Sequence, residues 1–173
     1  MADEGNIISD LDFGQEANGA DNAPSAGIIS QYVKDLSVEN PNAPECFQWQ
    51  DTPQVDIQFN LGARPLNEEV HEVEVKIVVN SKTKEGTAYV VDLSYCGLVG
   101  MRNLAPAQAH AFLYGEAPRI LFPFARRVLS DAVRDAGFAP LMLEPIDFNG
   151  LYMQQLAAQQ QGAGNEGEPV GNA

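Results

Sequence analysis

Apolar and polar residues alternate along much of the first half of the chain. Residues 55–61, 72–79 and 87–99 each carry an apolar side chain at nearly every second position. Successive side chains of a strand point to opposite faces, so each segment is predicted to be a half-buried antiparallel strand. The link at residues 81–86 is short, charged and ends in glycine, which is typical of a hairpin. The last two strands are therefore expected to be neighbours.

In these strands the alternation separates polar from apolar positions. In the third strand the apolar side holds Val73, Val75, Ile77 and Val79, and the other side holds Glu72, Glu74, Lys76 and Val78. In the fourth strand the corresponding sets are Tyr89, Val91, Leu93 and Tyr95 against Ala88, Val90, Asp92 and Ser94. We expect the first set of each strand to face the core.

An earlier strand is predicted to lead into a stretch with Pro41 and Pro44. Strict alternation places Tyr32, Leu36 and Val38 on one side of it, and Val33, Asp35, Ser37 and Glu39 on the other. Residues 39–53 are too long and too rich in proline and asparagine for a hairpin. This first strand is therefore expected to cross over before the second strand begins.

The second half of the chain changes to helical spacing. Residues 105–115 are predicted to form a helix that is interrupted before Pro118, and a second helix follows, with Pro123 near its start and Gly137 just after its end. Its apolar stripe holds Leu121, Phe124, Ala125, Val128, Leu129 and Ala132. Asp147 is expected to cap a last short helix with Phe148, Leu151, Tyr152, Gln155 and Leu156 along one side.

These elements predict an α+β domain, a four-stranded antiparallel sheet with a crossover connection, followed by helices packed on one face. We place this domain at residues 28–157. Residues 1–27 form an acidic N-terminal tail and residues 158–173 a C-terminal tail, and both hold too few large apolar side chains to offset the entropy of ordering. Both tails are therefore predicted to be disordered.

Charge excludes one large class of partner. The chain of 173 residues carries a net charge of −14. Eight acidic residues lie in the tails, which leaves 16 acidic against 10 basic residues between them. Such a charge repels phosphate backbones and favours cationic partners, so nucleic acid is not expected to bind.

The residue types needed for catalysis, metal binding or membrane insertion are not brought together. The two cysteines, Cys46 and Cys96, are too few for a disulfide framework, and neither histidine has metal-ligand spacing to other candidates. Glu72 and Glu74 share a strand face, but alternation puts them on the polar side, where ordinary pKa values are expected. We expect a cytoplasmic, non-enzymatic protein without cofactor or metal, and without direct membrane insertion.

The chain holds more aromatic and flexible apolar residues than such a small sheet-and-helix monomer needs. Examples lie in the crossover, beyond the fourth strand and in the final helix. This surplus is either buried by self-association or used to bind another molecule. Methionine and aromatic side chains suit a groove that accepts many partners, because they fill irregular space.

Three segments carry a resemblance to the SecB family of bacterial export chaperones. They are the strand and proline stretch of residues 32–44, the sequence ILFPFAR at residues 120–126, and the sequence PIDFNGLY at residues 145–152. The resemblance spans residues 28–156. It implies a homotetramer, a dimer of dimers, that holds unfolded preproteins in surface grooves without ATP and passes them to the translocase ATPase SecA.

The resemblance also implies two sets of site residues. The SecA contact falls on Asp35, Glu39, Val90 and Asp92, all on polar sides of their predicted strands; the family commonly has glutamate at the position of Asp92 and leucine at that of Val90. The client-binding groove falls on Phe47, Trp49, Val55, Ile57, Phe59, Phe148, Leu151 and Tyr152.

Two other interpretations remain open from the sequence. A SecB-like protein also serves as a general holdase or as a chaperone dedicated to an antitoxin. Alternatively, the protein is an oligomeric scaffold whose apolar surplus is buried in subunit contacts, with no client groove. The identity of clients and the roles of the two tails do not follow from the sequence.

Overall fold

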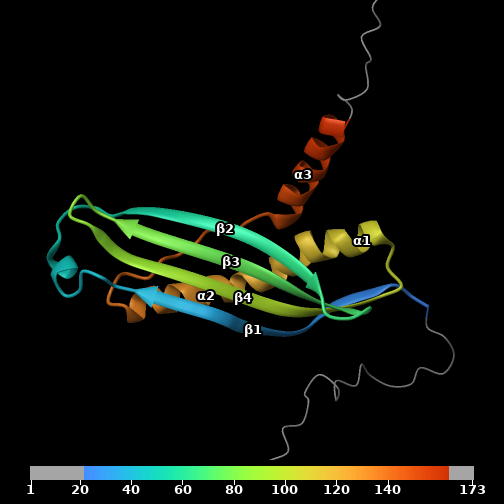
Figure 1. The fold of residues 1–173 in the computed structure, drawn as a ribbon, viewed down its shortest axis with the longest axis horizontal. Helices are drawn as coiled ribbons and strands as arrows, with labels where there is room; N and C mark the ends of the chain where they lie inside the picture. The colour runs from blue at the N-terminus through green and yellow to red at the C-terminus, as the bar shows by residue number, and fades with distance from the viewer. Residues whose placement is uncertain (1–21, 164–173) are drawn as a thin grey trace, which may run out of the picture.

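The computed structural model describes residues 22–163, which form one antiparallel sheet with helices on one side (Figure 1). The strand order is β1-β4-β3-β2, so β1 and β2 are the two edges and the crossover after β1 is confirmed. The neighbouring strands β3 and β4 are joined by the expected hairpin. The strands are β1 (Ser25–Glu39), β2 (Gln54–Pro65), β3 (Val70–Lys82) and β4 (Thr87–Arg102).

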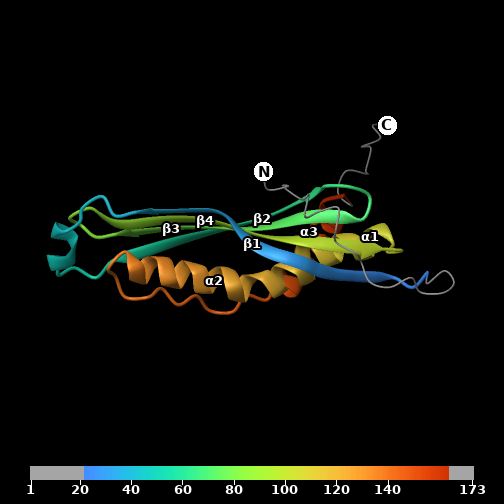
Figure 2. The ribbon, with the colours of Figure 1, turned by 90° about the horizontal axis from the view of Figure 1, so that it is seen from below.

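The helical half lies under one face of this sheet, as predicted. Figure 2 shows α2 packed below the strands, while no described helix covers the opposite face. We call these the helix face and the open face. The helical segments are α1 (Pro106–Ala111), a π-helical turn (Phe112–Glu116), α2 (Ala117–Asp135) and α3 (Phe148–Ala163).

The core lies between α2 and the two central strands. The side chains that β3 and β4 turn toward α2 are almost fully buried, and so is the buried stripe of α2. The fully buried examples include Val73, Val75, Ile77, Val79, Val91, Leu93, Leu121 and Leu129. The predicted division of β3 and β4 into apolar and polar sides is therefore confirmed.

The helices do not break where the sequence predicted. Instead of an interruption before Pro118, a π-helical turn joins α1 to α2, and the backbone stays helical through Glu116 and Ala117. Pro123 lies inside α2 rather than near its start. Its ring is exposed, on the side of the helix that points away from the sheet. Gly137, with φ of 95°, ends α2 as predicted, and the Phe138 amide donates to the Val133 carbonyl at 3.3 Å.

Strand β1 departs from strict alternation at two places. The register with β4 shifts between Ile28 and Ser30 and again between Val33 and Asp35, so Ile29 and Lys34 are extra residues. The second shift moves Tyr32 to the open face and Val33 to the helix face. The predicted grouping of Tyr32 with Leu36, and of Val33 with Asp35, is therefore wrong.

The regular secondary structure extends slightly beyond residues 28–157. Strand β1 begins at Ser25, before residue 28, and α3 continues to Ala163, beyond residue 157. Asp147 caps α3 as expected, because its Oδ1 accepts a hydrogen bond from the Gly150 amide at 2.9 Å. The remainder of the two predicted tails, residues 1–21 and 164–173, lies outside the described residues.

Candidate functional site

The four residues of the predicted SecA contact lie together on the open face. In the β1–β4 register, Glu39 is paired with Val90, Ser37 with Asp92, and Asp35 with Ser94. Paired residues of antiparallel strands point to the same side, so the four side chains occupy adjacent positions on two neighbouring strands. We call Asp35, Glu39, Val90 and Asp92 the acidic patch. Within residues 22–163, neither Asp35 nor Glu39 has a cation within ion-pair distance.

The largest departure from the sequence-based expectation is Glu72, also on the open face. Its side chain is only 7% exposed, whereas alternation predicted a solvated glutamate. Lys34 Nζ donates to Oε1 at 2.7 Å and Arg64 Nε donates to the same oxygen at 2.8 Å. The Tyr32 hydroxyl donates to Oε2. The donors come from both edge strands and meet over a central strand, so their stems cover the carboxylate.

This arrangement changes the pKa of Glu72. Burial alone would raise the pKa, but hydrogen bonds from Arg64, Lys34 and Tyr32 more than offset it and lower the pKa to about 2. Burial and the bond to Glu72 raise the pKa of Tyr32 well above its ordinary value. Glu72 therefore stays ionised and holds two of the cations of the open face.

A third cation, Lys76, is paired within the acidic patch. Its Nζ lies 3.1 Å from Oδ1 of Asp92, and the two side chains are 38% and 36% exposed. That oxygen is shielded from water, yet no described residue makes a hydrogen bond to it. Oδ1 of Asn80, which pairs in register with Val90, is in the same situation. Two buried acceptor atoms at the patch therefore receive no hydrogen bond from any described residue.

Most of the predicted client groove lies on the helix face at the β2 edge. Helix α2 covers the central strands but leaves Val55 and Phe59 about two-fifths exposed, at 40% and 41%. A pocket of about 330 Å³ opens where β2 meets α3. Its lining includes Phe59, Leu61, Tyr114, Phe148, Leu151 and Tyr152.

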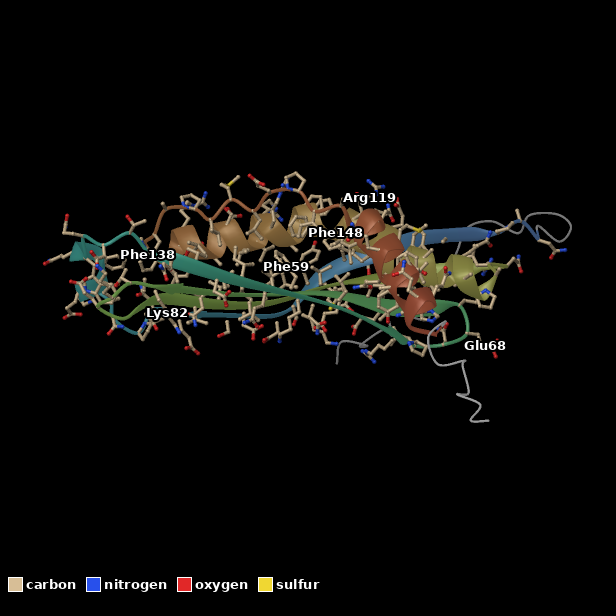
Figure 3. The ribbon with its side chains drawn as sticks, turned by 90° about the horizontal axis from the view of Figure 1, so that it is seen from above. Phe59, Glu68, Lys82, Arg119, Phe138 and Phe148 are labelled. Carbon is tan, nitrogen blue, oxygen red and sulfur yellow. The ribbon has the colours of Figure 1, made fainter. Side chains whose placement is uncertain are left out.

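An aromatic chain holds α3 over this pocket. The ring centroids of Phe59 and Phe122 are 6.0 Å apart, and those of Phe122 and Phe148 are 5.4 Å apart. Figure 3 shows Phe59 and Phe148 pointing into the same space between β2 and the helices. Phe148 and Tyr152 are buried, and the Tyr152 hydroxyl lies 2.8 Å from Nδ1 of His110. They therefore anchor α3, whereas Leu151, 49% exposed, is open to a ligand.

Phe47 belongs to a separate cluster at the far end of the sheet, and Trp49 lies at the same end, against Gly86 of the β3–β4 turn. Phe47 packs on Phe138, with ring centroids 5.2 Å apart, and Figure 3 shows Phe138 at the opposite end from α3. Gly137 allows this contact, because a Cβ there would lie 2.9 Å from the Phe47 ring. Ile57 and Val55 lie between the two clusters along β2. The predicted groove residues thus form a discontinuous line and not one pocket.

The asparagines of the crossover fix the position of this cluster. Asn40 Nδ2 donates to the Ala136 carbonyl at 3.0 Å, and Asn42 Nδ2 donates to the Thr87 carbonyl at 2.8 Å. The crossover is thereby tied both to the end of α2 and to the start of β4. From the sequence, these prolines and asparagines were used only as evidence against a hairpin, whereas in the structure the asparagine side chains make tertiary contacts.

Sequence reasoning missed an apolar row on the other edge strand. Val33, Leu36 and Val38 share the helix face of β1, and each is between 40% and 42% exposed. Phe124, which the helical spacing placed on the apolar stripe of α2, is 43% exposed, and Phe122 is buried instead. The bulge at Lys34 hid this row, since strict alternation assigned Val33 to the acidic side.

Residues 22–163 hold no cluster of three metal-ligating side chains. None of the helices in this range is both long enough and apolar enough to cross a membrane.

Comparison with known proteins gives a consistent result. The family model described as preprotein translocase subunit SecB matches residues 19–159. The protein-export protein SecB of Novosphingobium aromaticivorans is 63% identical, and that of Erythrobacter litoralis is 62% identical, each with 100% of both chains covered. The SecB-like chaperone of Mycobacterium tuberculosis, solved with a peptide from the HigA1 antitoxin, matches with a TM-score of 0.58 at 16% identity. That match covers 70% of this chain and 90% of that chain, and it shows a shared fold alone.

Fold and relatives together define a non-enzymatic chaperone of protein export, with preprotein clients and an interaction with the translocase. The chain belongs to the SecB family.

Proposed function

We propose that this protein acts in the cytoplasm as a homotetramer that holds unfolded preproteins without ATP and delivers them to SecA. The observation that carries the SecA part is the convergence of Asp35, Glu39, Val90 and Asp92 on adjacent registered positions of the open face. An acidic surface with an apolar residue inside it suits a basic and partly apolar segment. The basic, zinc-bearing tail of SecA has that chemistry in the family.

The open face also supports this contact through its distribution of cations. Lys34 is next to Asp35 in the chain, but its ammonium is bonded to Glu72. Arg64 is bonded to the same carboxylate. These two cations are held at Glu72, so Asp35 and Glu39 remain available to attract a cationic segment.

Charge reversal tests the SecA contact. The double substitution Asp35→Lys and Glu39→Lys is expected to weaken binding of SecA by at least about tenfold, because attraction is replaced by repulsion. Suppression of client aggregation should stay unchanged. A matched control, Glu85→Lys with Glu144→Lys, makes the same change in net charge at exposed positions in the β3–β4 turn and in the link to α3. Calorimetry or interferometry with purified SecA gives the affinities.

One outcome would count against this contact, and a second would require a milder substitution. If the control weakens SecA binding equally, only overall charge matters and the patch has no specific role. If aggregation suppression falls together with SecA binding, and circular dichroism shows lost structure, the substitutions have unfolded the protein, and the milder Asp35→Asn then serves as the test.

The apolar positions of the helix face are the proposed client surface. Phe47, Val55, Phe59 and Leu151 each remain between 40% and 49% exposed along the β2 edge and its two ends. Ile57 and Trp49 are partly buried and pack on the core beside them. An extended client that spans both clusters would gain affinity from several modest contacts on one chain.

Single substitutions test whether clients bind this surface specifically or bind any exposed apolar residue. Leu151→Ser and Phe47→Ser are each expected to weaken binding of reduced, carboxymethylated α-lactalbumin by about fivefold, because burial of one apolar side chain is lost. Met142→Ser is the control, since Met142 is 74% exposed but lies outside the clusters. An equal loss with the control would mean that clients bind any exposed apolar residue, and no loss in either test variant would exclude the proposed groove.

The apolar row of β1 supports self-association. Val33, Leu36 and Val38 lie beside α2, whose outer side exposes Phe124. Such residues on one side of a monomer suit a second copy packed against the helix layer. Leu36→Glu should therefore lower the mass measured by light scattering from that of a tetramer. A tetramer that persists in this variant would place the subunit contacts elsewhere.

A further inference from the structure

The carboxylates of the acidic patch are not equally available to a partner. Asp35 and Glu39 have no ion pair with any described residue, whereas Asp92 lies 3.1 Å from the Lys76 ammonium. Lys76 is not among the residues that the family resemblance assigns to the SecA contact. Its place on the patch raises the question of what it does to partner binding.

Strand register explains how the two side chains meet. In the β3–β4 pairing, Lys76 is opposite Ser94 and Asp92 is opposite Val78, so Lys76 and Asp92 are diagonal neighbours on the open face. A lysine side chain spans this diagonal easily. Both side chains are more than one-third exposed, at 38% and 36%, so a partner that lies on the open face reaches them.

The pair lacks the geometry of a strong interaction. Oδ1 of Asp92 makes no hydrogen bond with a described residue, although the ammonium is close, so the contact is an ion pair without a directional bond. By contrast, Lys34 and Arg64 both donate hydrogen bonds to Glu72, whose side chain is 7% exposed. Exposed ion pairs of this kind contribute little stability, so a cation from a partner can compete with Lys76 for Asp92 at small cost.

We propose that Lys76 is the internal counter-ion of Asp92, and that it competes with a cationic partner for this carboxylate. Lys76 therefore lowers the affinity of the acidic patch for basic segments and favours partners that place a cation at Asp92. This inference rests on the proposed SecA contact, which it deepens by adding a specificity-determining residue.

A double-mutant cycle tests the proposal. Lys76→Gln, Asp92→Asn and their combination are prepared, with Lys84→Gln as a control that removes the same charge in the exposed turn between β3 and β4. Two probes are titrated at low salt: the basic zinc-bearing tail of SecA, and hexa-arginine. Circular dichroism and light scattering check that each variant keeps its structure and assembly.

The expected result is a gain in affinity of about threefold for K76Q, in keeping with the weak interaction of an exposed ion pair, and a smaller gain for K84Q. The gain from K76Q should also be larger when Asp92 is present than on the D92N background. Simple repulsion between Lys76 and the probe would give equal gains on both backgrounds, because it does not involve Asp92.

The outcomes separate the two proposals. Equal gains on both backgrounds, a gain no larger than that of K84Q, or a loss of affinity in K76Q would each overturn the counter-ion role. A larger gain on the Asp92 background with hexa-arginine, but no binding of the SecA tail, would support the counter-ion role and reject the SecA contact. Binding of neither probe would reject both.

Discussion

The two faces of the sheet are built from the same four strands but are stabilised differently. On the helix face, the inward side chains of β3 and β4 are apolar and almost fully buried against α2. On the open face, the least exposed charged residue is Glu72, which is covered by the stems and donor groups of Tyr32, Lys34 and Arg64. One face excludes water by apolar packing, whereas on the other the only buried charge among the described residues, Glu72, is kept from water by paired cations and a tyrosine hydroxyl.

This difference bears on how the protein uses each face. A packed apolar layer tolerates few changes of volume, because its neighbours have no room to adjust. A charged surface with one ordered network can exchange its remaining partners with little effect on the fold. The open face can therefore serve recognition, whereas on the helix face the packed centre maintains the structure and only the exposed edges remain available to partners.

The largest expected effect is on the helix face. Leu121→Ala should lower the free energy of unfolding by about 2–5 kcal/mol, because Leu121 is fully buried between α2 and the sheet. Urea denaturation at a fixed protein concentration measures the change. On the open face, Val78→Ala should cost less than about 1 kcal/mol, since Val78 is partly exposed. Similar costs for the two substitutions would contradict the proposed difference between the faces.

A smaller effect is expected at the one buried charge of the open face. Glu72→Gln should cost about 2 kcal/mol at neutral pH, because hydrogen bonds to a charged acceptor are weakened. The pKa of folded Glu72 is about 2, below its ordinary value of 4.5, so its contribution is complete above about pH 5 and is lost as pH falls from about 4.5 to about 2.

The urea midpoint of E72Q should therefore change less than that of the wild type between pH 7 and pH 3. Other carboxylates titrate in both proteins, so only the difference between the two is diagnostic. Identical pH dependence would show that Glu72 is not held ionised by its three donors.

The smallest expected change in the free energy of unfolding concerns two glycines on opposite faces of the sheet. A Cβ at Gly97 would lie 2.7 Å from Cδ2 of the buried Leu121, whereas one at Gly62 would meet only Oε2 of Glu74 at 3.8 Å. Gly97→Ala should cost about 1–2 kcal/mol through overpacking, and Gly62→Ala should stay within about 0.5 kcal/mol of the wild type. Thermal unfolding of the two variants side by side measures both, and a reversed order would mean that α2 adjusts freely.

Much of the fold follows from local pattern. Alternation in β3 and β4 gives the correct core face, because both strands pair without a bulge along most of their length. The crossover was predictable because proline and asparagine favour turns and loops, and the cap at Asp147 because aspartate favours the start of a helix. The prolines of the helical half led to a wrong prediction of where the helices break. Pro118 and Pro123 both lie within continuous helix.

The candidate site is only partly predictable from the sequence. Alternation near the end of β1, beyond the bulge, places Asp35 and Glu39 on one side, but their grouping with Val90 and Asp92 came from the family resemblance. The state of Glu72 does not, because its three donors lie 40, 38 and 8 residues away in the chain and meet it only in the folded sheet. The exposure of the helix face at both edges depends on how much of the sheet one helix can cover, and no local pattern specifies that.

The paired irregularities of β1 have a consequence for how this strand can change in length. Ile29 and Lys34 each add one residue, so the frame of inward and outward positions is inverted after the first and restored after the second. Removal of either residue alone would put one part of the strand out of phase with the rest, whereas removal of both would leave Asp35 and Glu39 facing the same way. Insertions and deletions in this strand should therefore be accepted in compensating pairs, as frameshifts are in a coding sequence.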